Sequence, residues 1–250
     1  MKKTVVVIGG GYGGIRAIEH LKDRDDLEIV LLDRHPYHYL QPEIYDFIAN
    51  KSEISDVTID LFSLCEGFGE SVKFFKRDVL DIDVKEKVVI TDIDNFKYDY
   101  LIISAGARTN FNTNIEGLKE CTHGVKSLKR ALEFKQKFES AIYRKLEAEG
   151  GVCTEKFNIV IGGAGISGVE IAAEMAYYSR EFYRNGAFNC DNINVYLISS
   201  QKTVLPGLDK YLIEKSTKRL LSLGVKIITN KKISKVEQNA VYFNDGTSID

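Results

Sequence analysis

The chain contains the same short pattern twice, as "VVVIGGGYGG" at residues 5–14 and as "IVIGGAGISG" at residues 159–168. In both copies a β-branched apolar run ends in a cluster of glycines, and a helix-like stretch follows. A strand, a glycine turn and a helix together bring the helix N-terminus close to the pyrophosphate of a dinucleotide. The repeat unit is far too long for a solenoid. The sequence therefore predicts two related dinucleotide-binding units.

The first turn meets the G-x-G-x-x-G pattern with Gly9, Gly11 and Gly14. The first glycine permits a tight turn, the second lets the backbone approach the pyrophosphate, and the third lets helix and strand pack closely. Asp33 lies 19 residues after Gly14, at the end of the next predicted strand. A carboxylate there can accept hydrogen bonds from a ribose diol, so this context favours a dinucleotide over an ordinary glycine-rich turn.

The second turn meets the pattern with Gly163, Gly165 and Gly168, but Ser199 stands where the acid belongs. A carboxylate there bonds the ribose 2′-hydroxyl of NADH and repels the 2′-phosphate of NADPH, whereas serine does neither. We expect a site that tolerates NADPH, with Lys202 contacting the phosphate, or one that binds NADH weakly. In the alternative interpretation, Ser199 and Lys202 are ordinary loop residues.

Hydrophobic patterning predicts an α/β fold with two Rossmann-like domains, each with a parallel sheet and an added antiparallel β segment. The predicted domains are 1–115 and 116–250, the second including a connecting helix over 127–149. Apolar runs predict strands at 4–8, 27–33, 98–107, 157–162 and from 193, the third of which ends in small residues. Helical spacing predicts helices at 13–24 and 166–180, and loops with short helices fill 34–66. Alternating segments at 72–95 and 224–250 predict antiparallel strands.

Composition excludes several classes of protein. The 250 residues are 44% hydrophobic and 28% charged, with a net charge of −2, so no basic excess indicates nucleic acid as a partner. No apolar run approaches the length of a membrane-spanning helix, and we expect a cytoplasmic location. Cys65, Cys121, Cys153 and Cys190 lack the spacing of a metal site or redox pair. His35 and His38 lack further ligands, so no metal site is expected.

Four stretches resemble a known family. The two turns together resemble the two-dinucleotide-binding-domain flavoproteins, and "YDYLIISAGART" resembles their intermediate motif. "DRHPYHYLQPEIYDF" and "GISGVEIAAEM" resemble type II NADH:quinone oxidoreductases, as does "TVLPGLDKYL". The resemblance implies FAD on the first turn and NAD(P)H on the second, with the two rings stacked. Hydride would pass from NAD(P)H to the flavin, and electrons would pass on to a quinone.

The resemblance also implies roles for particular residues. Glu170 would lie near the flavin and position substrate or handle a proton, although it also fits an acid in the first turn of a helix. Gln41 and Pro42 would line the flavin and the approach of the quinone, and Pro42 also fits a loop stiffener. The expected catalytic residues are Glu170 and Gln41. The expected cofactor-binding residues are Gly9, Gly11, Tyr12, Gly13, Gly14, Asp33, Arg34, His38, Gln41, Pro42, Val79, Ala105, Gly106, Gly163, Gly165, Ile166, Ser167, Gly168 and Ser199.

Two neighbouring families are weighed against this resemblance. Glutathione-reductase-like enzymes carry a CxxxxC pair where residues 35–50 contain no cysteine, which excludes thiol–disulfide chemistry. Sulfide:quinone oxidoreductases have a cysteine just beyond the second turn, where this chain has Gly168, Val169 and Glu170. Sulfide oxidation is kept as an alternative, and so is a nucleotide-binding module without catalysis.

In the families that the chain resembles, the segment ending at Asp250 leads into a third stretch that returns to the flavin domain. We therefore expect an incomplete member of the family. The absent region is also expected to dock peripherally on the cytoplasmic face of the inner membrane and to form a homodimer.

Overall fold

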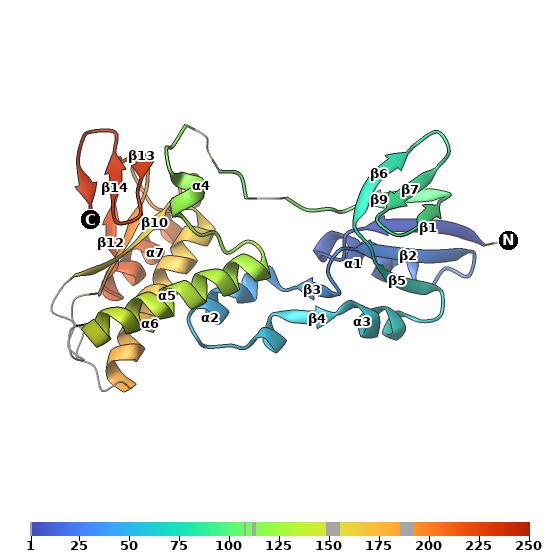
Figure 1. The fold of residues 1–250 in the computed structure, drawn as a ribbon, viewed down its shortest axis with the longest axis horizontal. Coiled ribbons are helices and arrows are strands. Elements are labelled where there is room, and N and C mark those ends of the chain that lie inside the picture. The colour runs from blue at the N-terminus through green and yellow to red at the C-terminus, as the bar shows by residue number, and fades with distance from the viewer. Residues whose placement is uncertain (1, 108, 112–113, 149–155, 186–192) are drawn as a thin grey trace. The chain divides into compact units, whose positions relative to one another are not determined.

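The computed structural model describes residues 2–107, 109–111, 114–148, 156–185 and 193–250. The chain divides into two compact units (Figure 1). The first unit contains residues 1–41 and 54–108, and the second contains residues 42–53 and 109–250. The short segment 42–53 thus belongs with the second half of the chain.

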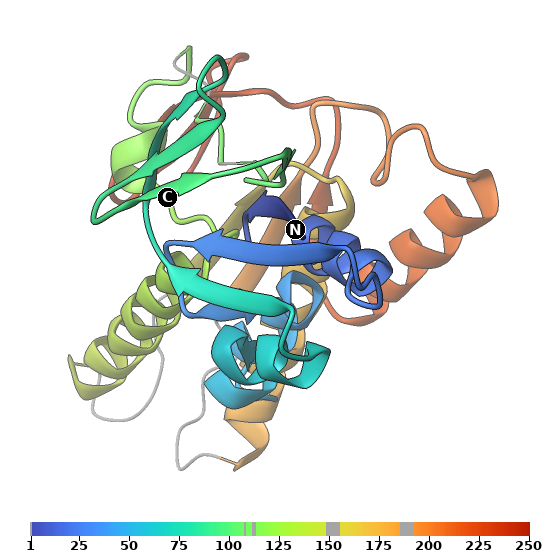
Figure 2. The same cartoon turned by 90° about the vertical axis from the view of Figure 1, so that its right-hand side faces the viewer.

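A four-stranded parallel sheet forms the centre of the first unit, in the order β5-β2-β1-β9. Its strands are β1 (Lys3–Ile8), β2 (Leu27–Asp33), β5 (Val72–Lys76) and β9 (Tyr100–Ile103). The predicted strands at 4–8 and 27–33 are confirmed. Figure 2 looks onto this unit and shows β2 beside β5.

Both faces of this sheet are covered, because successive side chains of a strand point to opposite faces. Val5 and Val7 of β1 pack in one core with residues of α1 (Tyr12–Leu21) and α3 (Leu61–Phe68). Val6 and Ile8 pack on the other side against the antiparallel sheet β6-β7-β8. That sheet consists of β6 (Val79–Asp83), β7 (Val88–Thr91) and β8 (Asn95–Lys97). The shorter elements are β3 (Tyr37–Tyr39), η1 (Gln41–Glu43), η2 (Ile54–Asp56) and β4 (Thr58–Asp60).

The second unit repeats this arrangement around the parallel sheet β10-β11-β12. The sheet strands are β10 (Phe157–Gly162), β11 (Ile193–Ile198) and β12 (Lys226–Ile228), and they contact α6 (Ile166–Asn185) and α7 (Lys210–Ser222). The antiparallel sheet of this unit consists of β13 (Ile233–Val236), β14 (Val241–Phe243) and β15 (Ser248–Ile249). The remaining helices are α2 (Ile44–Ile48), α4 (Leu118–Cys121) and α5 (Leu128–Ala148). Helix α5 confirms the predicted connecting helix.

The direction of two strands was predicted wrongly. Residues 72–76 and 226–228 were expected to be antiparallel, but β5 runs parallel to β2 and β12 runs parallel to β11. Both lie at the edge of their sheet. The side chains of β5 alternate between buried and exposed, whereas those of β12 are exposed or half-buried. Such a pattern shows that a strand is half-buried, but not in which direction its partner runs.

Helix α7 has no counterpart among the predicted helices. The sequence nonetheless contains a helix-start signal, because Asp209 is a residue type that caps helices. In the structure its carboxylate accepts a hydrogen bond from the Tyr211 N–H at the start of α7. Its less exposed positions, Ile213, Thr217 and Leu220, recur at helical spacing. The helix connects β11 to β12, as a parallel pair requires.

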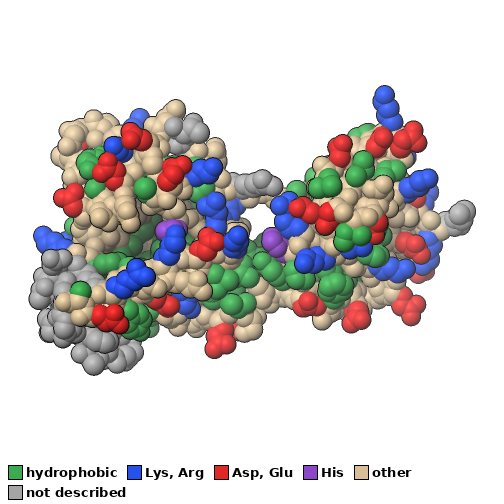
Figure 3. All heavy atoms as spheres, in the orientation of Figure 1, with side chains coloured by type: hydrophobic (Ala, Val, Ile, Leu, Met, Phe, Trp, Pro, Cys, Tyr) green, Lys and Arg blue, Asp and Glu red, His purple; other side chains and the backbone are tan. Residues whose placement is uncertain are grey.

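The surface shows both charge signs on both units. In the view of Figure 3, lysines and arginines lie among aspartates and glutamates on each unit. No helix among the described residues is long and apolar enough to cross a membrane.

Candidate functional site

The two glycine turns have the same backbone hydrogen bonds. The Gly9 N–H donates to the Leu32 carbonyl over 2.8 Å, and the Gly163 N–H donates to the Ile198 carbonyl over 2.9 Å. Each helix then begins with a bond to the second glycine, from Ile15 to Gly11 and from Val169 to Gly165, at 3.0 Å in both cases. The repeated sequence pattern therefore produces one repeated backbone structure.

Each glycine of the pattern has its own reason to lack a side chain. Gly9 and Gly163 have φ values of +104° and +100°, which side chains rarely permit. A Cβ at Gly14 would overlap the carbonyl oxygen of Gly9, and one at Gly168 would overlap that of Gly163.

The middle glycines, Gly11 and Gly165, face open space instead. The N-terminus of α1 also has no side chain capping it, so its first-turn N–H groups can bind an anion. Both turns thus fit a pyrophosphate that approaches close to the backbone.

Asp33 organises the first turn from the end of β2. One carboxylate oxygen accepts the Gly10 N–H over 2.7 Å, and the other accepts the His35 N–H over 2.8 Å. His38 lies buried beneath the turn, where its Nδ1–H donates to the Gly10 carbonyl over 2.8 Å. The Tyr12 and His38 rings form a T-shaped pair with 4.7 Å between their centroids. Asp33 and His38 therefore hold the turn from two sides.

The segment after β9 also lies on the first turn. The Ser104 N–H donates to the Ile8 carbonyl over 2.7 Å, and a Cβ at Gly9 would overlap the Ser104 carbonyl. Ala105 and Gly106 follow in exposed positions, with a φ of +69° at Gly106. The absence of a side chain at Gly9 thus allows close contact between the two loops.

The other predicted residues of the first half are more scattered. Gly13 is exposed in the first turn of α1, and Arg34 forms an ion pair with Asp78 at 3.4 Å. Val79 is half-buried at the start of β6, in the core beneath the sheet. Gln41 is half-buried and Pro42 is exposed, both in η1, where the chain first passes from the first unit to the second.

In the second turn, Ile166, Ser167 and Glu170 are exposed on α6. Ser167 accepts a hydrogen bond from the Tyr45 hydroxyl over 3.0 Å. The alternative interpretation of Glu170 as a first-turn acid is wrong, because α6 begins at Ile166 and its first turn contains no acidic residue. Glu170 begins the second turn, where the favourable effect of the helix dipole on an acid has weakened.

Ser199 is the structural counterpart of Asp33. Each residue directly follows the strand residue whose carbonyl binds the first glycine N–H. The Ser199 side chain is buried, and its hydroxyl donates to the Thr203 carbonyl over 2.9 Å and accepts the Gln201 N–H over 3.2 Å. Lys202 is exposed in the same loop. The hydroxyl of Ser199 is thus engaged within its own loop.

The thiols and histidines form no catalytic cluster among the described residues. Burial raises the pKa of the Cys65 thiol to about 11, whereas Cys121 is exposed and unpaired. Cys153 and Cys190 lie outside the described residues. His35 stacks on Tyr37 with 5.2 Å between the ring centroids. In the part of the chain that the structure describes, no three His, Cys, Asp or Glu side chains gather where they could hold a metal ion.

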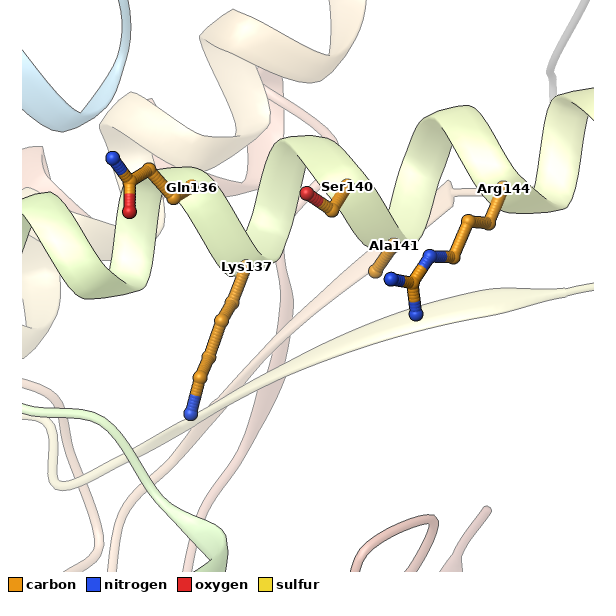
Figure 4. Close-up of a pocket in the computed structure, with 5 residues that line it drawn as sticks. All are labelled: Gln136, Lys137, Ser140, Ala141 and Arg144. Carbon is orange, nitrogen blue, oxygen red and sulfur yellow. The ribbon is translucent and has the colours of Figure 1, made fainter.

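A shallow hollow of about 360 Å³ lies on the surface of α5 (Figure 4). It is lined by Gln136, Lys137, Ser140, Ala141 and Arg144, all from this one helix. None of these side chains is a predicted site residue, and among the described residues no second element contributes to the lining. The glycine turns therefore remain the candidate site.

The α2 segment, residues 42–53, carries a contact to the second turn that the sequence analysis did not predict. The two residues of this contact, Tyr45 and Ser167, are 122 positions apart along the chain. The one signal for this region in the sequence is the "DRHPYHYLQPEIYDF" stretch, which includes Tyr45.

The family model for pyridine nucleotide-disulphide oxidoreductases matches residues 3–250. The chain belongs to this family. Within the family it is similar to the NADH dehydrogenase-like protein YutJ of Bacillus subtilis, with 32% identity over 97% of this chain and 61% of that protein. It is also similar to the type II NADH:quinone oxidoreductase Ndh of Mycobacterium tuberculosis, with 30% identity over 98% of this chain and 54% of that protein.

A solved structure shares the fold of this chain. NDH2 from Plasmodium falciparum in complex with NADH matches all of this chain and 53% of its own length, with a TM-score of 0.87 and 20% identity. This match confirms the predicted α/β class with Rossmann-like units. The chain spans roughly half to three-fifths of the length of these family members.

Proposed function

We propose that this chain forms the dinucleotide-binding part of an FAD-dependent NAD(P)H:quinone oxidoreductase. The observation that carries the proposal is the pair of glycine turns with identical backbone bonding, of which only the first has an acid at the end of the next strand. Two such turns in one chain suit two different dinucleotides. The similarity to proteins named as NADH dehydrogenases supports the direction of electron flow.

The first turn would hold FAD. Gly11 leaves room for the pyrophosphate, and the first-turn N–H groups of α1 would bind its oxygens. Asp33 would accept hydrogen bonds from the ribose while it continues to bind the Gly10 N–H. Ala105 and Gly106 would let the chain pass close to the cofactor. Bound FAD would supply the redox chemistry, with a hydride taken from NAD(P)H and two electrons passed to a quinone.

The second turn would hold NAD(P)H on Gly163, Gly165 and Gly168. No carboxylate at position 199 repels a 2′-phosphate, and Lys202 is exposed in the same loop. We therefore propose that this site accepts NADPH as well as NADH. The buried Ser199 hydroxyl bonds within its own loop, which leaves ribose recognition to other groups.

Glu170 is the proposed acid–base or positioning group, because it is an exposed carboxylate two residues after Gly168, the last glycine of the coenzyme turn. Replacement with Gln keeps its size and removes its charge. We expect Glu170→Gln to lower turnover by about a hundredfold if it transfers a proton in the slow step. Unchanged turnover with both NAD(P)H and quinone would exclude this role, with Glu214→Gln on the exposed face of α7 as the control.

An enzyme that reduces a quinone would contact this acceptor at a membrane surface. We propose peripheral attachment on the cytoplasmic face of the inner membrane, in a homodimer, as the resemblance implies. Gln41 and Pro42 would line the approach of the quinone. Co-sedimentation with lipid vesicles and light scattering would test these two points separately.

An anaerobic visible spectrum tests the proposed function most directly. The FAD-supplemented chain is recorded before and after NADH, NADPH or sulfide is added to separate samples. Loss of flavin absorbance with NADH or NADPH supports the proposal. Loss with sulfide alone would support sulfide oxidation, and a chain that binds nucleotide without flavin would be a binding module.

A further inference from the structure

The α2 segment contacts the second glycine turn through one hydrogen bond. The Tyr45 hydroxyl donates to Ser167 Oγ over 3.0 Å, and Ser167 is the second residue of α6. Tyr45 is half-buried, whereas Ser167 is exposed beside Gly165 and Gly168. A half-buried group thus orients a hydroxyl at the end of the helix where the coenzyme pyrophosphate is proposed to bind.

Asn50 fixes the far end of the α2 segment. Its φ is +58°, a left-handed conformation that asparagine tolerates better than most residues. Its side-chain amide donates to Glu139 Oε1 on α5 over 2.8 Å and to the Tyr178 hydroxyl on α6 over 2.7 Å. One residue therefore ends α2 and joins it to two helices.

Lys51 adds an ionic contact to the same helix. Its ammonium pairs with Glu174, whose side chain is only 17% exposed, and lies 4.1 Å from the centre of the Tyr177 ring. Asp46 lies 3.6 Å from the same ammonium. Glu174 Oε2 accepts no hydrogen bond from the described residues, so the ammonium is what compensates its burial.

The positions on α6 form one stripe. Ser167, Glu174 and Tyr178 are separated by seven and four residues, which places them on one face of a helix. Glu170 lies between Ser167 and Glu174 at the same kind of spacing. The α2 segment therefore follows the face of α6 that begins at the coenzyme turn and includes the proposed acid–base residue.

We propose that Tyr45 is a positioning residue for the nicotinamide coenzyme and acts through Ser167. A serine hydroxyl that accepts from tyrosine still has its own proton to donate. The oxygens of a pyrophosphate are acceptors, so the oriented Ser167 proton points to a pyrophosphate oxygen as its partner. Asn50 and Lys51 keep Tyr45 in place. The inference rests on the proposed binding of NAD(P)H at this turn.

The test compares two Tyr→Phe variants in the full 250-residue chain. Tyr45→Phe removes only the hydroxyl, and Tyr242→Phe removes a hydroxyl that donates to Glu237 over the same 3.0 Å, in the antiparallel sheet of the same unit. The chain is first saturated with FAD, so that the first turn is occupied. NAD⁺ is then titrated calorimetrically, because it binds without reducing the flavin.

We expect Tyr45→Phe to raise the NAD⁺ dissociation constant by about threefold to tenfold, the effect of one net hydrogen bond. Ser167→Ala should raise it by a similar factor, and the double variant should add little, because both changes remove the same interaction. Tyr242→Phe should bind as the unchanged chain does. In steady-state assays the loss should appear in KM for NAD(P)H, with kcat for quinone reduction nearly constant.

Two results would overturn the inference, and they have different consequences for the proposed function. Equal dissociation constants for the unchanged chain and Tyr45→Phe would exclude the positioning role while leaving the proposed function intact. Failure of the unchanged FAD-loaded chain to bind NAD⁺ would exclude both. A thermal unfolding scan accompanies each titration, and a merely structural role for Tyr45 would lower the midpoint without changing affinity below it.

Discussion

The two glycine turns share their backbone bonds but differ in the residue that follows the next strand. Asp33 binds two backbone N–H groups, one of them in the glycine turn itself. Ser199 makes its two bonds with Gln201 and Thr203, within its own loop. The turn thus forms with or without the acid, because the glycines determine its shape. The residue at the strand end can therefore differ between the two turns without a change in these backbone bonds.

The largest effect is expected where a glycine touches backbone. Gly14→Ala and Gly168→Ala place a methyl group on a carbonyl oxygen, so the backbone must shift and each should cost about 3 kcal/mol or more of unfolding free energy. Gly11→Ala and Gly165→Ala meet open space, and we expect a cost near 1 kcal/mol or less. Urea denaturation measures all four. Equal costs for Gly11→Ala and Gly14→Ala in the first turn, or for Gly165→Ala and Gly168→Ala in the second, would contradict the assigned roles.

The next effect concerns the acid. Asp33→Ser makes the first turn resemble the second, and the Gly10 and His35 N–H groups lose a charged acceptor. We expect a loss of about 2 kcal/mol in unfolding free energy and weaker FAD retention after gel filtration. Asp99→Ser is the control, since that carboxylate also accepts a backbone N–H, from Thr4 over 2.8 Å. If Asp99→Ser loses FAD equally, Asp33 has no special role.

The reciprocal change tests coenzyme selection. Ser199→Asp introduces the missing carboxylate and should weaken binding of NADP⁺ by about tenfold relative to NAD⁺, through repulsion of the 2′-phosphate. Lys202→Ala should weaken NADP⁺ binding and leave NAD⁺ binding nearly unchanged. Titration of each variant with both coenzymes provides the ratio. Equal losses for the two coenzymes on Lys202→Ala would remove the phosphate contact.

The smallest expected effect is a difference in reactivity between one thiol of each unit, Cys65 and Cys121. Burial raises the pKa of Cys65 from 9.0 to about 11, so its reactive thiolate is favoured only as the pH rises through that value. We expect iodoacetamide at pH 8 to label the exposed Cys121 and to leave Cys65 unmodified until the chain unfolds. Peptide mass mapping distinguishes the two sites. Rapid labelling of Cys65 in the folded chain would contradict its burial.

The sequence predicts what depends on local chemistry. Glycine spacing located both turns, and β-branched runs located β1, β2, β10 and β11, because a buried parallel strand must be apolar along its length. Counting to the strand end identified Ser199 as the counterpart of Asp33. These features need no knowledge of distant partners.

Features that depend on distant partners were not predictable. The directions of β5 and β12 depend on which strand each one joins, and an edge strand looks alike in either direction. The contact of Tyr45 with Ser167 joins residues 122 positions apart, and that of Asn50 with Tyr178 joins residues 128 apart. The bonding of Ser199 within its loop depends on a turn geometry that one serine does not reveal.

The grouping of segment 42–53 with the second half has a consequence for how the chain reaches its native state. The chain passes between the two units after residues 41, 53 and 108. Segment 42–53 can therefore pack only after α5 and α6 have been synthesised. Closing such long loops slows folding. During synthesis from the N-terminus, Phe47 and its buried neighbours Ile44 and Ile48 would remain exposed until the second half emerges. Cutting the gene between the two halves would leave α2 on the wrong fragment.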